Sequence, residues 1–328
     1  MTLILTASQL TELANMQATI AAVENAFGDI SRGTSHQPAP TTLQLPSSDA
    51  RFIPMTALSD ASCAASVKLL ADLPGNAEHG LPTQRSTIVL VSQSTGETLG
   101  FLDGRVPTRV RTAAASAVAS KHLARPESTT LGLVGAGALA VAHVEAMLNV
   151  LPIKTVVVWS RSTATTDSFQ ALIAHHQLQV VVATSVQQVV ESADVLCTLT
   201  PATEPLVQGS WFTPGLHVNA VGSRPRPEHR EIDSEAVRRA CIFVDSLSTA
   251  RTKSGDLIIP VNEGVLSFED VIGELGDVIT GKVGGRSGIE DITLFNSVGI
   301  GLQDLAIGRL LYDAALEQGV GLDVDMSR

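Results

Sequence analysis

The sequence has few cysteines, few aromatic residues and no excess of basic residues, and these shortages exclude several classes of protein. Only three cysteines occur among 328 residues, at positions 63, 197 and 241, without the paired spacing of a disulfide-rich secreted scaffold, so we expect a reducing compartment. Lys and Arg number 22 against 33 Asp and Glu. The resulting net charge of −11 argues against nucleic acid or an anionic membrane as the main partner.

Long apolar segments are missing as well. No uninterrupted apolar run reaches membrane-spanning length, and the first residues lack the basic region and long apolar core of a signal peptide. No spacing of His, Cys and Asp suggests a metal site. We therefore expect a soluble cytoplasmic protein with no membrane partner and no metal.

What the chain does contain is aliphatic sequence: 44% of its residues are hydrophobic but only 3% are aromatic. The length allows two domains. In the middle of the chain, short apolar strand patterns alternate with helical patterns, which predicts a doubly wound parallel sheet. These strands are expected at residues 130–135, 155–160, 179–183, 194–199, 216–221 and 241–245.

The two ends of the chain have a different organisation, which predicts an α+β domain. A helix is expected over residues 7–28, with a capping box formed by Thr6 and Gln9, followed by a loop over 33–46. The last helix, about 301–318, is so apolar that we expect it to return to the N-terminal domain. Strands are expected near 51–58, 66–70, 86–92 and 98–103, and an Ala-rich helix over 112–124 should lead into the parallel domain.

The most informative motif follows the first parallel strand. Gly135 allows a tight turn, Gly137 lets the backbone approach a pyrophosphate, and Ala140 lets helix and strand pack closely. The phosphates would bind the free N–H groups at the helix N-terminus, around Ala138 and Leu139. The alternative is a glycine turn of an α/β domain that binds no dinucleotide.

The end of the second parallel strand indicates which dinucleotide. NAD-binding versions of the motif end this strand with an acid that binds the ribose hydroxyls, but here Ser160, Arg161 and Ser162 follow it. An arginine among hydroxyl side chains suits the 2′-phosphate of NADPH. We therefore expect NADPH, with NADH a weaker cofactor; the alternative is that Arg161 is only a solvated residue.

Several segments together resemble the ornithine cyclodeaminase/mu-crystallin family, in matching order over about residues 50–312. The first three are Arg111-Thr-Ala-Ala-Ala-Ser-Ala117, Gly135-Ala-Gly137 with His143, and Ala202-Thr-Glu-Pro205. The others are Pro214-Gly-Leu-His217-Val-Asn219-Ala-Val-Gly222, Arg230-Glu-Ile-Asp233, Glu274-Leu-Gly276 and Phe295-Asn-Ser297-Val-Gly299. No single motif is specific, but the set is.

The resemblance implies a fold and a division of labour. A Rossmann domain at 116–300 would bind the cofactor, and residues 1–115 with 301–328 would form a substrate-binding and dimerisation domain of a homodimer. Family members transfer hydride between a nicotinamide and the carbon beside a carboxylate, in cyclodeaminases, alanine dehydrogenases and ketimine reductases. Mu-crystallin-like members also bind NADPH and an aromatic hormone, which leaves a ligand-binding protein as an alternative.

By position, Lys68 and Arg111 match the family's basic residues at the substrate carboxylate, where Lys68 could also donate a proton. The alternatives are a lysine that reaches solvent from a strand edge and an arginine held in a salt bridge near a helix N-terminus. Pro40 stands where the family commonly has a third basic residue that binds the substrate carboxylate. Either the site has only two such residues, or Arg51 or Arg85 is the third.

One departure favours a reductase. Cyclodeaminases and the related alanine dehydrogenases carry an aspartate after the Asn-Ala-Val-Gly turn, which in cyclodeaminases activates the side-chain amine. In this sequence Ser223 and Arg224 follow Gly222 instead. A preformed cyclic imine needs no such base. We therefore expect NADPH-dependent reduction of Δ1-pyrroline-2-carboxylate or Δ1-piperideine-2-carboxylate to L-proline or L-pipecolate; a cyclodeaminase or alanine dehydrogenase remains the alternative.

The remaining site predictions concern loops at the sheet edge. Ser223 is expected near the substrate. His143 and His217 are expected to be structural, Glu231 and Asp233 to cap a helix, and residues 281–288 to form either a mobile lid or an exposed loop. Asp304 matches a family acid near the site. Further cofactor contacts are expected from Thr112, Thr198, Leu199, Thr200, Val221, Ser297 and Gly299.

Overall fold

The computed structural model describes residues 2–326, and the chain divides into two compact units. One unit joins Met1–Arg111 to Ile300–Arg328, and the other is Thr112–Gly299. The boundaries predicted from sequence, after 115 and after 300, differ from these by four residues and by one. Helix α3 (Arg105–Leu123) runs through the first boundary. The substrate and dimerisation roles given to the first unit stay predictions.

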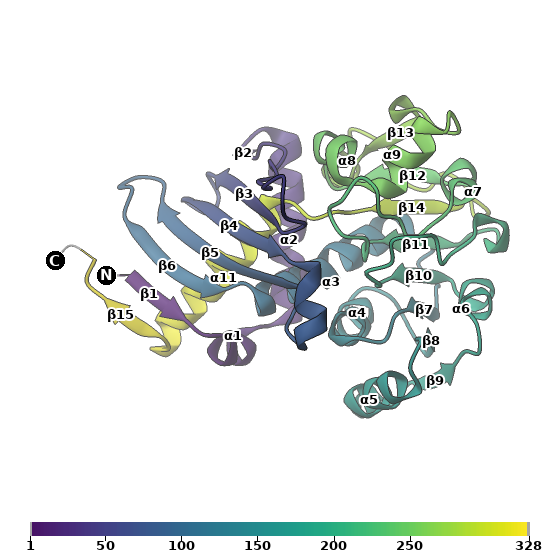
Figure 1. Cartoon of the computed structure of the whole chain (residues 1–328), viewed down its shortest axis with the longest axis horizontal. Coiled ribbons are helices and arrows are strands. Elements are labelled where there is room, and N and C mark those ends of the chain that lie inside the picture. Colours follow the sequence, from purple (N-terminus) through teal and green to yellow (C-terminus); the bar gives the residue numbers. More distant parts are fainter. Residues whose placement is uncertain (1, 327–328) are drawn as a thin grey trace. The chain divides into compact units, whose positions relative to one another are not determined.

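The unit Thr112–Gly299 is built on a parallel eight-stranded sheet, sheet B (Figure 1). Its order is β13-β12-β14-β11-β10-β7-β8-β9, so the chain reverses direction across the sheet between β7 and β10. Such a switch point opens a crevice at the carboxyl ends of the two strands. The strands are β7 (Thr130–Val134), β8 (Thr155–Trp159), β9 (Gln179–Val182), β10 (Val195–Thr198), β11 (His217–Ala220), β12 (Cys241–Val244), β13 (Val271–Glu274) and β14 (Thr293–Asn296).

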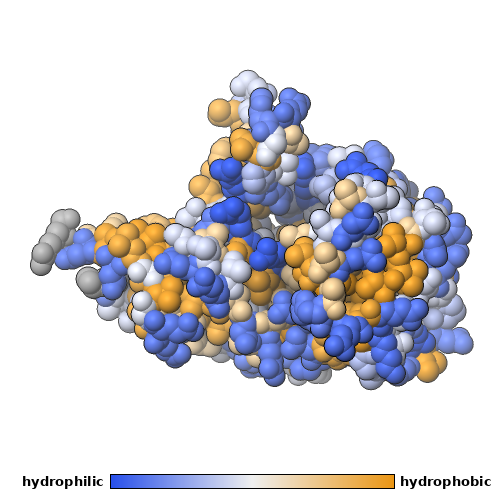
Figure 2. Space-filling model, turned by 90° about the horizontal axis from the view of Figure 1, so that it is seen from below, coloured by the Kyte–Doolittle hydropathy of each residue, from blue (hydrophilic) through white to orange (hydrophobic). Residues whose placement is uncertain are grey.

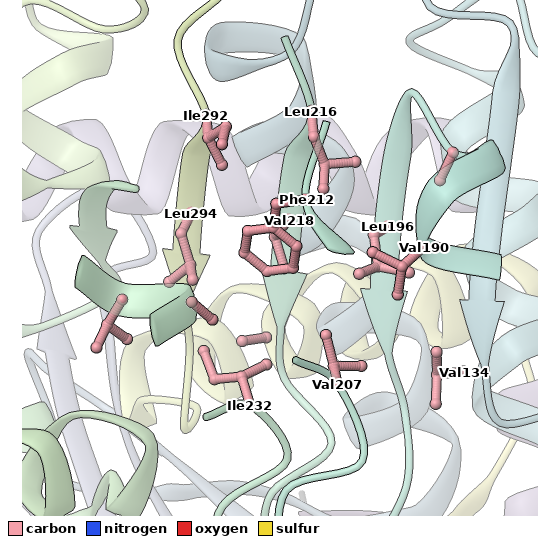
Figure 3. Close-up of a cluster of buried hydrophobic side chains, with 14 of the residues drawn as sticks. Val134, Val190, Leu196, Val207, Phe212, Leu216, Val218, Ile232, Ile292 and Leu294 are labelled. Atoms are coloured by element: carbon pink, nitrogen blue, oxygen red, sulfur yellow. The ribbon is translucent and has the colours of Figure 1, made fainter. Parts of the chain in front are cut away.

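The central strands of sheet B are buried on both faces, which explains the apolar runs of β7, β8 and β12. On one face, Leu196, Val218 and Leu294 from three neighbouring strands pack in a cluster with Phe212 and Ile232 (Figure 3). A second cluster covers the other face. The helices of this unit are α4 (Ala138–Leu148), α5 (Thr163–Ile173), α6 (Val186–Ser192), α7 (Ser234–Arg239), α8 (Leu247–Lys253), α9 (Gly255–Asn262) and α10 (Leu275–Ile279).

The other unit contains a seven-stranded mixed sheet, sheet A, in the order β15-β1-β6-β5-β4-β3-β2. Helix α11 (Gly301–Gln318) packs on β3, β4 and β5 and against α2 (Met16–Arg32), as expected for the last helix (Figure 1). The strands are β1 (Thr2–Leu5), β2 (Ser35–His36), β3 (Arg51–Ser59), β4 (Ala64–Asp72), β5 (Gln84–Ser92), β6 (Thr98–Asp103) and β15 (Leu322–Val324), and α1 is Ala7–Leu13.

The central strands of sheet A alternate between a buried and an exposed face. In β4 every second residue, including Lys68, is buried, while Val67 and Leu69 are exposed on the opposite face. Phe52 and Leu58 of the neighbouring β3 are exposed as well. On the molecular face shown in Figure 2, hydrophobic residues form contiguous orange areas among hydrophilic ones.

The fold class is confirmed, and the predicted elements are largely present, with three differences. The helix expected over 7–28 is two helices, because Ala14 is extended and Asn15 caps α2 by accepting a hydrogen bond from Ala18 N–H. Helix α3 begins at Arg105, seven residues before the predicted start at 112. Strands β1, β2, β13, β14 and β15 were not expected, and β2 lies within the segment predicted to be loop, 33–46. No helix within residues 2–326 is both long and apolar enough to cross a membrane.

Candidate active site

A pocket of about 470 Å³ opens at the carboxyl ends of β7 and β10, where the chain reverses across sheet B. Six predicted cofactor residues line it: Gly135, Gly137, Ser160, Arg161, Leu199 and Thr200. The sequence analysis missed the rest of its lining, although it had noted the Ala202-Thr-Glu-Pro205 motif without assigning it a role. These residues are Ala136, Trp159, Thr165, Pro201, Ala202, Thr203, Glu204 and Leu206.

The glycine turn fits a dinucleotide phosphate. Gly135 has φ +114, and a Cβ there would lie 2.9 Å from Leu199 O, so a side chain is excluded. A Cβ on Gly137 would meet nothing within 4 Å, which leaves its backbone open to a ligand. No side chain caps α4, and its first turn, with Ala138 and Leu139, carries no acid. Its N-terminal N–H groups can therefore bind an anion.

The polar residues after β8 lie at the same pocket. Arg161 is exposed and Ser160 half-buried, and both line the pocket, while Ser162 stands at the N-cap of α5. The acidic residue in the lining, Glu204, comes from the segment after β10, not from the end of β8. A positive charge therefore stands at the strand end where NAD-binding domains commonly carry an acid.

Glu231 does not cap a helix, so that prediction is wrong; Asp233 alone caps α7, accepting from Ala236 N–H. The Glu231 carboxylate is buried and accepts hydrogen bonds from the hydroxyls of Thr198 and Thr200. Burial raises the pKa of Glu231 to about 7, with the negative charge of Asp256 adding to the rise and the threonine hydrogen bonds opposing it. The hydroxyls of Thr198 and Thr200, which were expected to contact the cofactor, therefore bind the buried Glu231 carboxylate. Hydrophobic periodicity in the sequence cannot reveal such a contact.

Asp245, the residue after β12, is a second buried acid that accepts hydrogen bonds from a loop, here the segment that follows β14. Its Oδ2 accepts from Ser297 Oγ at 2.7 Å and from Gly299 N–H at 2.8 Å, and Ser297 is buried. Val221 is half-buried beyond β11, and Thr112 lies within α3. None of these four predicted cofactor residues lines the pocket, so their contacts with a cofactor stay predictions.

A separate group of ionised side chains lies in the other unit, under α11. Lys68 on β4 and Arg111 on α3 both pair with Asp304 on α11, at 2.7 Å (Nζ to Oδ2) and 3.1 Å (Nε to Oδ1). The three residues are 1%, 5% and 0% exposed. Arg111 Nη1 also donates to Gln303 Oε1 at 2.6 Å. The structure thus brings together Lys68, Arg111 and the acid whose role the sequence left unassigned.

Charge does not balance in this group, which we call the ion cluster (Lys68, Arg111 and Asp304). Two cations face one carboxylate, so the cluster carries one positive charge when Lys68 is protonated. Burial lowers the pKa of Lys68 to about 8; Asp304 opposes the shift and Arg111 adds to it. A lysine that reaches solvent from a strand edge is therefore excluded, and a buried net charge of this kind favours an anionic ligand.

The candidates for a third basic arm lie elsewhere. Arg51 is at the start of β3, four residues before Met55, the partner of Lys68 in the sheet, and its Nε donates to Gln44. Arg85 lines a separate pocket of about 370 Å³ with Leu69 and so faces the opposite side of sheet A from Lys68. Within residues 2–326, the ion cluster therefore has two basic residues rather than three.

The other predicted residues have structural contacts in the unit Thr112–Gly299. Ser223 Oγ donates to His229 O at 2.9 Å. His143 and His217 are buried, and burial lowers the pKa of His143 to about 4 and that of His217 to about 3, so both are neutral structural residues as expected. Arg286, in the segment 281–288, donates to Leu216 O just before β11. This is the amino end of the strand, at the sheet edge opposite the pocket. The segment 281–288 is therefore not a lid over the pocket.

Comparison with known proteins gives one consistent result. The model of the ornithine cyclodeaminase/mu-crystallin family matches residues 1–319. The structure of Thermococcus litoralis Δ1-pyrroline-2-carboxylate reductase with NADH and L-proline is 34% identical, with a TM-score of 0.94, 98% of this chain and 100% of that chain being covered.

Two other relatives carry different names. An archaeal alanine dehydrogenase dimer with bound NAD is 33% identical over 99% of both chains, with a TM-score of 0.92. The ketimine reductase mu-crystallin of Mus musculus is 38% identical over 79% of each chain. With a family match over nearly its whole length, the chain belongs to the ornithine cyclodeaminase/mu-crystallin family.

Proposed function

We propose that this protein reduces a small cyclic ketimine carboxylate, Δ1-pyrroline-2-carboxylate or Δ1-piperideine-2-carboxylate, to L-proline or L-pipecolate with NADPH. It is an oxidoreductase that acts on carbon–nitrogen bonds with a nicotinamide cofactor, as its relatives are. The observation that carries the proposal is the buried ion cluster, whose single positive charge suits a substrate with one carboxylate.

Within the cluster, the two basic residues have different tasks. Arg111 uses Nε and Nη1 for Asp304 and Gln303, so Nη2 is the nitrogen left to hold the substrate carboxylate. Lys68, whose pKa of about 8 keeps it mostly protonated at neutral pH, is the proton donor for the imine nitrogen. Burial of both side chains excludes water and strengthens both interactions.

The cofactor would bind the pocket of the other unit. Its phosphates would lie on the free N–H groups at the start of α4, and a 2′-phosphate would pair with Arg161. The nicotinamide supplies the hydride that reduces the imine carbon. Two relatives with solved structures hold NADH or NAD, so the preference for NADPH rests on Arg161 and the missing acid alone.

Two other activities are the alternatives within the family. An ornithine cyclodeaminase needs a base after Gly222, but Ser223 there donates its hydroxyl to His229 O. An alanine dehydrogenase-type enzyme would take up ammonia with an open-chain oxo acid, and one relative has that name. A mu-crystallin-like protein that mainly binds NADPH and a ligand would retain the same pocket and cluster.

One set of assays separates these activities. We expect NADPH oxidation with the two cyclic ketimines, no ammonia release from ornithine, and little oxidation with pyruvate plus ammonia. Arg111→Lys should lower kcat/KM for the ketimine at least about tenfold, because a lysine cannot reproduce the planar guanidinium contacts. Arg105→Lys, at the exposed start of the same helix, is the matched control. Normal ketimine reduction by Arg111→Lys would contradict the proposed grip.

We also propose that the protein is a homodimer that uses the exposed face of sheet A. Phe52, Leu58, Val67 and Leu69 on adjacent strands leave an apolar surface there, opposite α11. The archaeal alanine dehydrogenase relative is a dimer. A second copy of the chain would cover this surface.

A further inference from the structure

We propose that Glu231 is a positioning residue of the cofactor pocket: its buried carboxylate holds the segment after β10 in the place that shapes the pocket wall. Glu231 does not line the pocket, whereas Leu199 and Thr200 do. The inference rests on the proposed binding of a nicotinamide dinucleotide there. It assigns a task to a residue that the proposed reaction itself does not use.

The contacts of the Glu231 carboxylate are evenly divided. Oε1 accepts from Thr200 N–H at 2.6 Å and from Thr200 Oγ1 at 2.6 Å. Oε2 accepts from Gly222 N–H at 2.9 Å and from Thr198 Oγ1 at 2.7 Å. Each oxygen therefore accepts one backbone N–H and one hydroxyl, and the carboxylate joins the segments that follow β10 and β11.

Glu231 is itself anchored on both sides of its backbone. Its N–H donates to Asp256 Oδ1 at 2.8 Å, and its carbonyl accepts from Leu206 N–H at 2.9 Å and Val207 N–H at 3.0 Å. The next residue, Ile232, is fully buried in the apolar cluster of Figure 3. A carboxylate on so rigid a support can impose a position on the loops that it binds.

The segment that Glu231 holds packs directly on the glycine turn. A Cβ on Gly135 would lie 2.9 Å from Leu199 O, and a Cβ on Gly222 would lie 2.4 Å from Thr200 N. Both glycines are therefore in close contact with residues 199–200. A shift of this segment would narrow or tilt the turn on which the cofactor phosphates are expected to bind.

The arrangement needs a carboxylate and not merely a polar side chain. A glutamine at 231 has only one side-chain oxygen, so its NH₂ group would face the N–H of either Thr200 or Gly222. The NH₂ group and the N–H are both donors, so they cannot form a hydrogen bond. Relief of this mismatch requires the segment after β10 or the turn after β11 to move. Cofactor binding must then restore the original position, which weakens the affinity.

The test measures cofactor affinity directly, by the fluorescence of NADPH and NADH, along with the melting temperature of each variant. In Glu231→Gln we expect the Kd of the preferred cofactor to rise at least about tenfold, the scale of one buried donor left unpaired. The KM for the cofactor should rise likewise, with kcat for the ketimine within about threefold of wild type. Thr198→Val is the second variant, for use if Glu231→Gln does not fold. It removes one hydrogen bond to Glu231 and should raise the Kd about threefold. Thr198 is fully buried, so this effect would act through Glu231 and not through a direct contact with the cofactor.

The matched control is Asp194→Asn, an acid-to-amide change in the same unit. Asp194 Oδ2 accepts from Thr129 N–H and Thr130 N–H, at the amino end of β7 and so away from the pocket. Asp194→Asn should have a lower melting temperature than the wild-type protein but an unchanged Kd for the cofactor. An unchanged Kd in folded Glu231→Gln, or in Thr198→Val if that variant alone folds, would overturn the inference. A wild-type protein that binds neither cofactor would overturn the proposed function as well.

Discussion

The charge of Lys68 is the residue property on which the proposed reaction most depends. Burial lowers the pKa of this ammonium to about 8, and the nearby Asp304 carboxylate keeps it from falling further. A donor with a pKa near the working pH can both hold its proton and release it in the transition state. In the proposed reaction, Asp304 would therefore act on the chemistry through Lys68.

This gives a prediction with a definite sign. Because the protonated amine is lost as pH rises through its pKa, kcat for ketimine reduction should fall above about pH 8. Asp304→Asn removes the charge that raises the pKa of Lys68, so the fall should begin at lower pH. The measurement is the pH profile of kcat for each enzyme. Asp313→Asn, on the same helix but paired with Arg309, should leave the profile unchanged; an unshifted profile in Asp304→Asn would disprove the donor role of Lys68.

A second prediction concerns Arg161. Arg161→Ala should raise the KM for NADPH roughly ten- to a hundredfold, because a charge-assisted contact with a phosphate contributes about 1.5–3 kcal/mol. The KM for NADH should change little, since NADH lacks the 2′-phosphate. Lys154→Ala removes an exposed cation just before β8, at its amino end, and should affect neither cofactor. Equal affinity of the wild-type protein for both cofactors would disprove the preference.

Sequence alone identified many residues of the two candidate sites, Asp304 among them, but not which residues the buried acids Asp304 and Glu231 contact. Gly135, Gly137 and Arg161 follow strands directly, so strand periodicity was enough to locate them at the sheet edge. Asp304 contacts Arg111 across 193 positions, and Glu231 contacts Thr198 across 33. Such pairs arise only when the fold is complete, which is why Glu231 was interpreted as a local helix cap.

At the scale of single elements, length and burial decided what could be predicted. The apolar strand patterns of β7, β8 and β10 were located to within a residue or so, as was α11. Strands β13 and β14 lie on either side of β12 in sheet B and were not predicted, although β10 is equally short. Strand β13 is at the edge of the sheet and only partly buried, so it has no continuous apolar run that would reveal it. The break between α1 and α2 depends on one cap, Asn15, within an otherwise helical pattern.

Two glycines of α11 give a prediction about packing. A Cβ on Gly301 would lie 2.5 Å from Thr56 O, a backbone atom of β3 that cannot move aside alone. A Cβ on Gly308 would meet only side-chain atoms, those of Leu90 at 3.2 Å and of Ile88 at 3.7 Å. Gly301→Ala should therefore destabilise the protein by about 1–3 kcal/mol through overpacking. Gly308→Ala should be neutral or stabilising by up to about 1 kcal/mol, because alanine favours helix.

Denaturant unfolding of the two variants, followed by circular dichroism, measures both effects. The pair is informative because the substitution and the helix are the same, while Gly301 is the first residue of α11 and packs on backbone, and Gly308 is in its interior and packs on side chains. Equal stability of Gly301→Ala and Gly308→Ala would show that α11 can move away from β3 at little cost.

At the scale of the whole molecule, the organisation follows from hydrophobic surface that one element cannot bury alone. Helix α11 is buried along most of its length, and its apolar composition was the reason to expect that it returns to the N-terminal unit. The same reasoning applies to sheet A, whose inner face is covered by α11 while its outer face leaves aliphatic side chains exposed. The strands β3, β4, β5 and β6 of this sheet were predicted from sequence, but the face that remains uncovered was not, because it depends on where α11 packs.

The proposed homodimer yields the last prediction. Val67 and Leu69 are 41% and 45% exposed on the outer face of β4, between the neighbouring strands β3 and β5. Replacing both by glutamate places charges that a dimer would have to bury, so the molar mass measured by light scattering should fall from that of two chains to one. Leu172→Glu with Val182→Glu, two aliphatic positions in the other unit that are 58% and 42% exposed, should leave the dimer intact. A wild-type monomer, or a Val67→Glu/Leu69→Glu variant that remains dimeric, would show that sheet A does not form the interface.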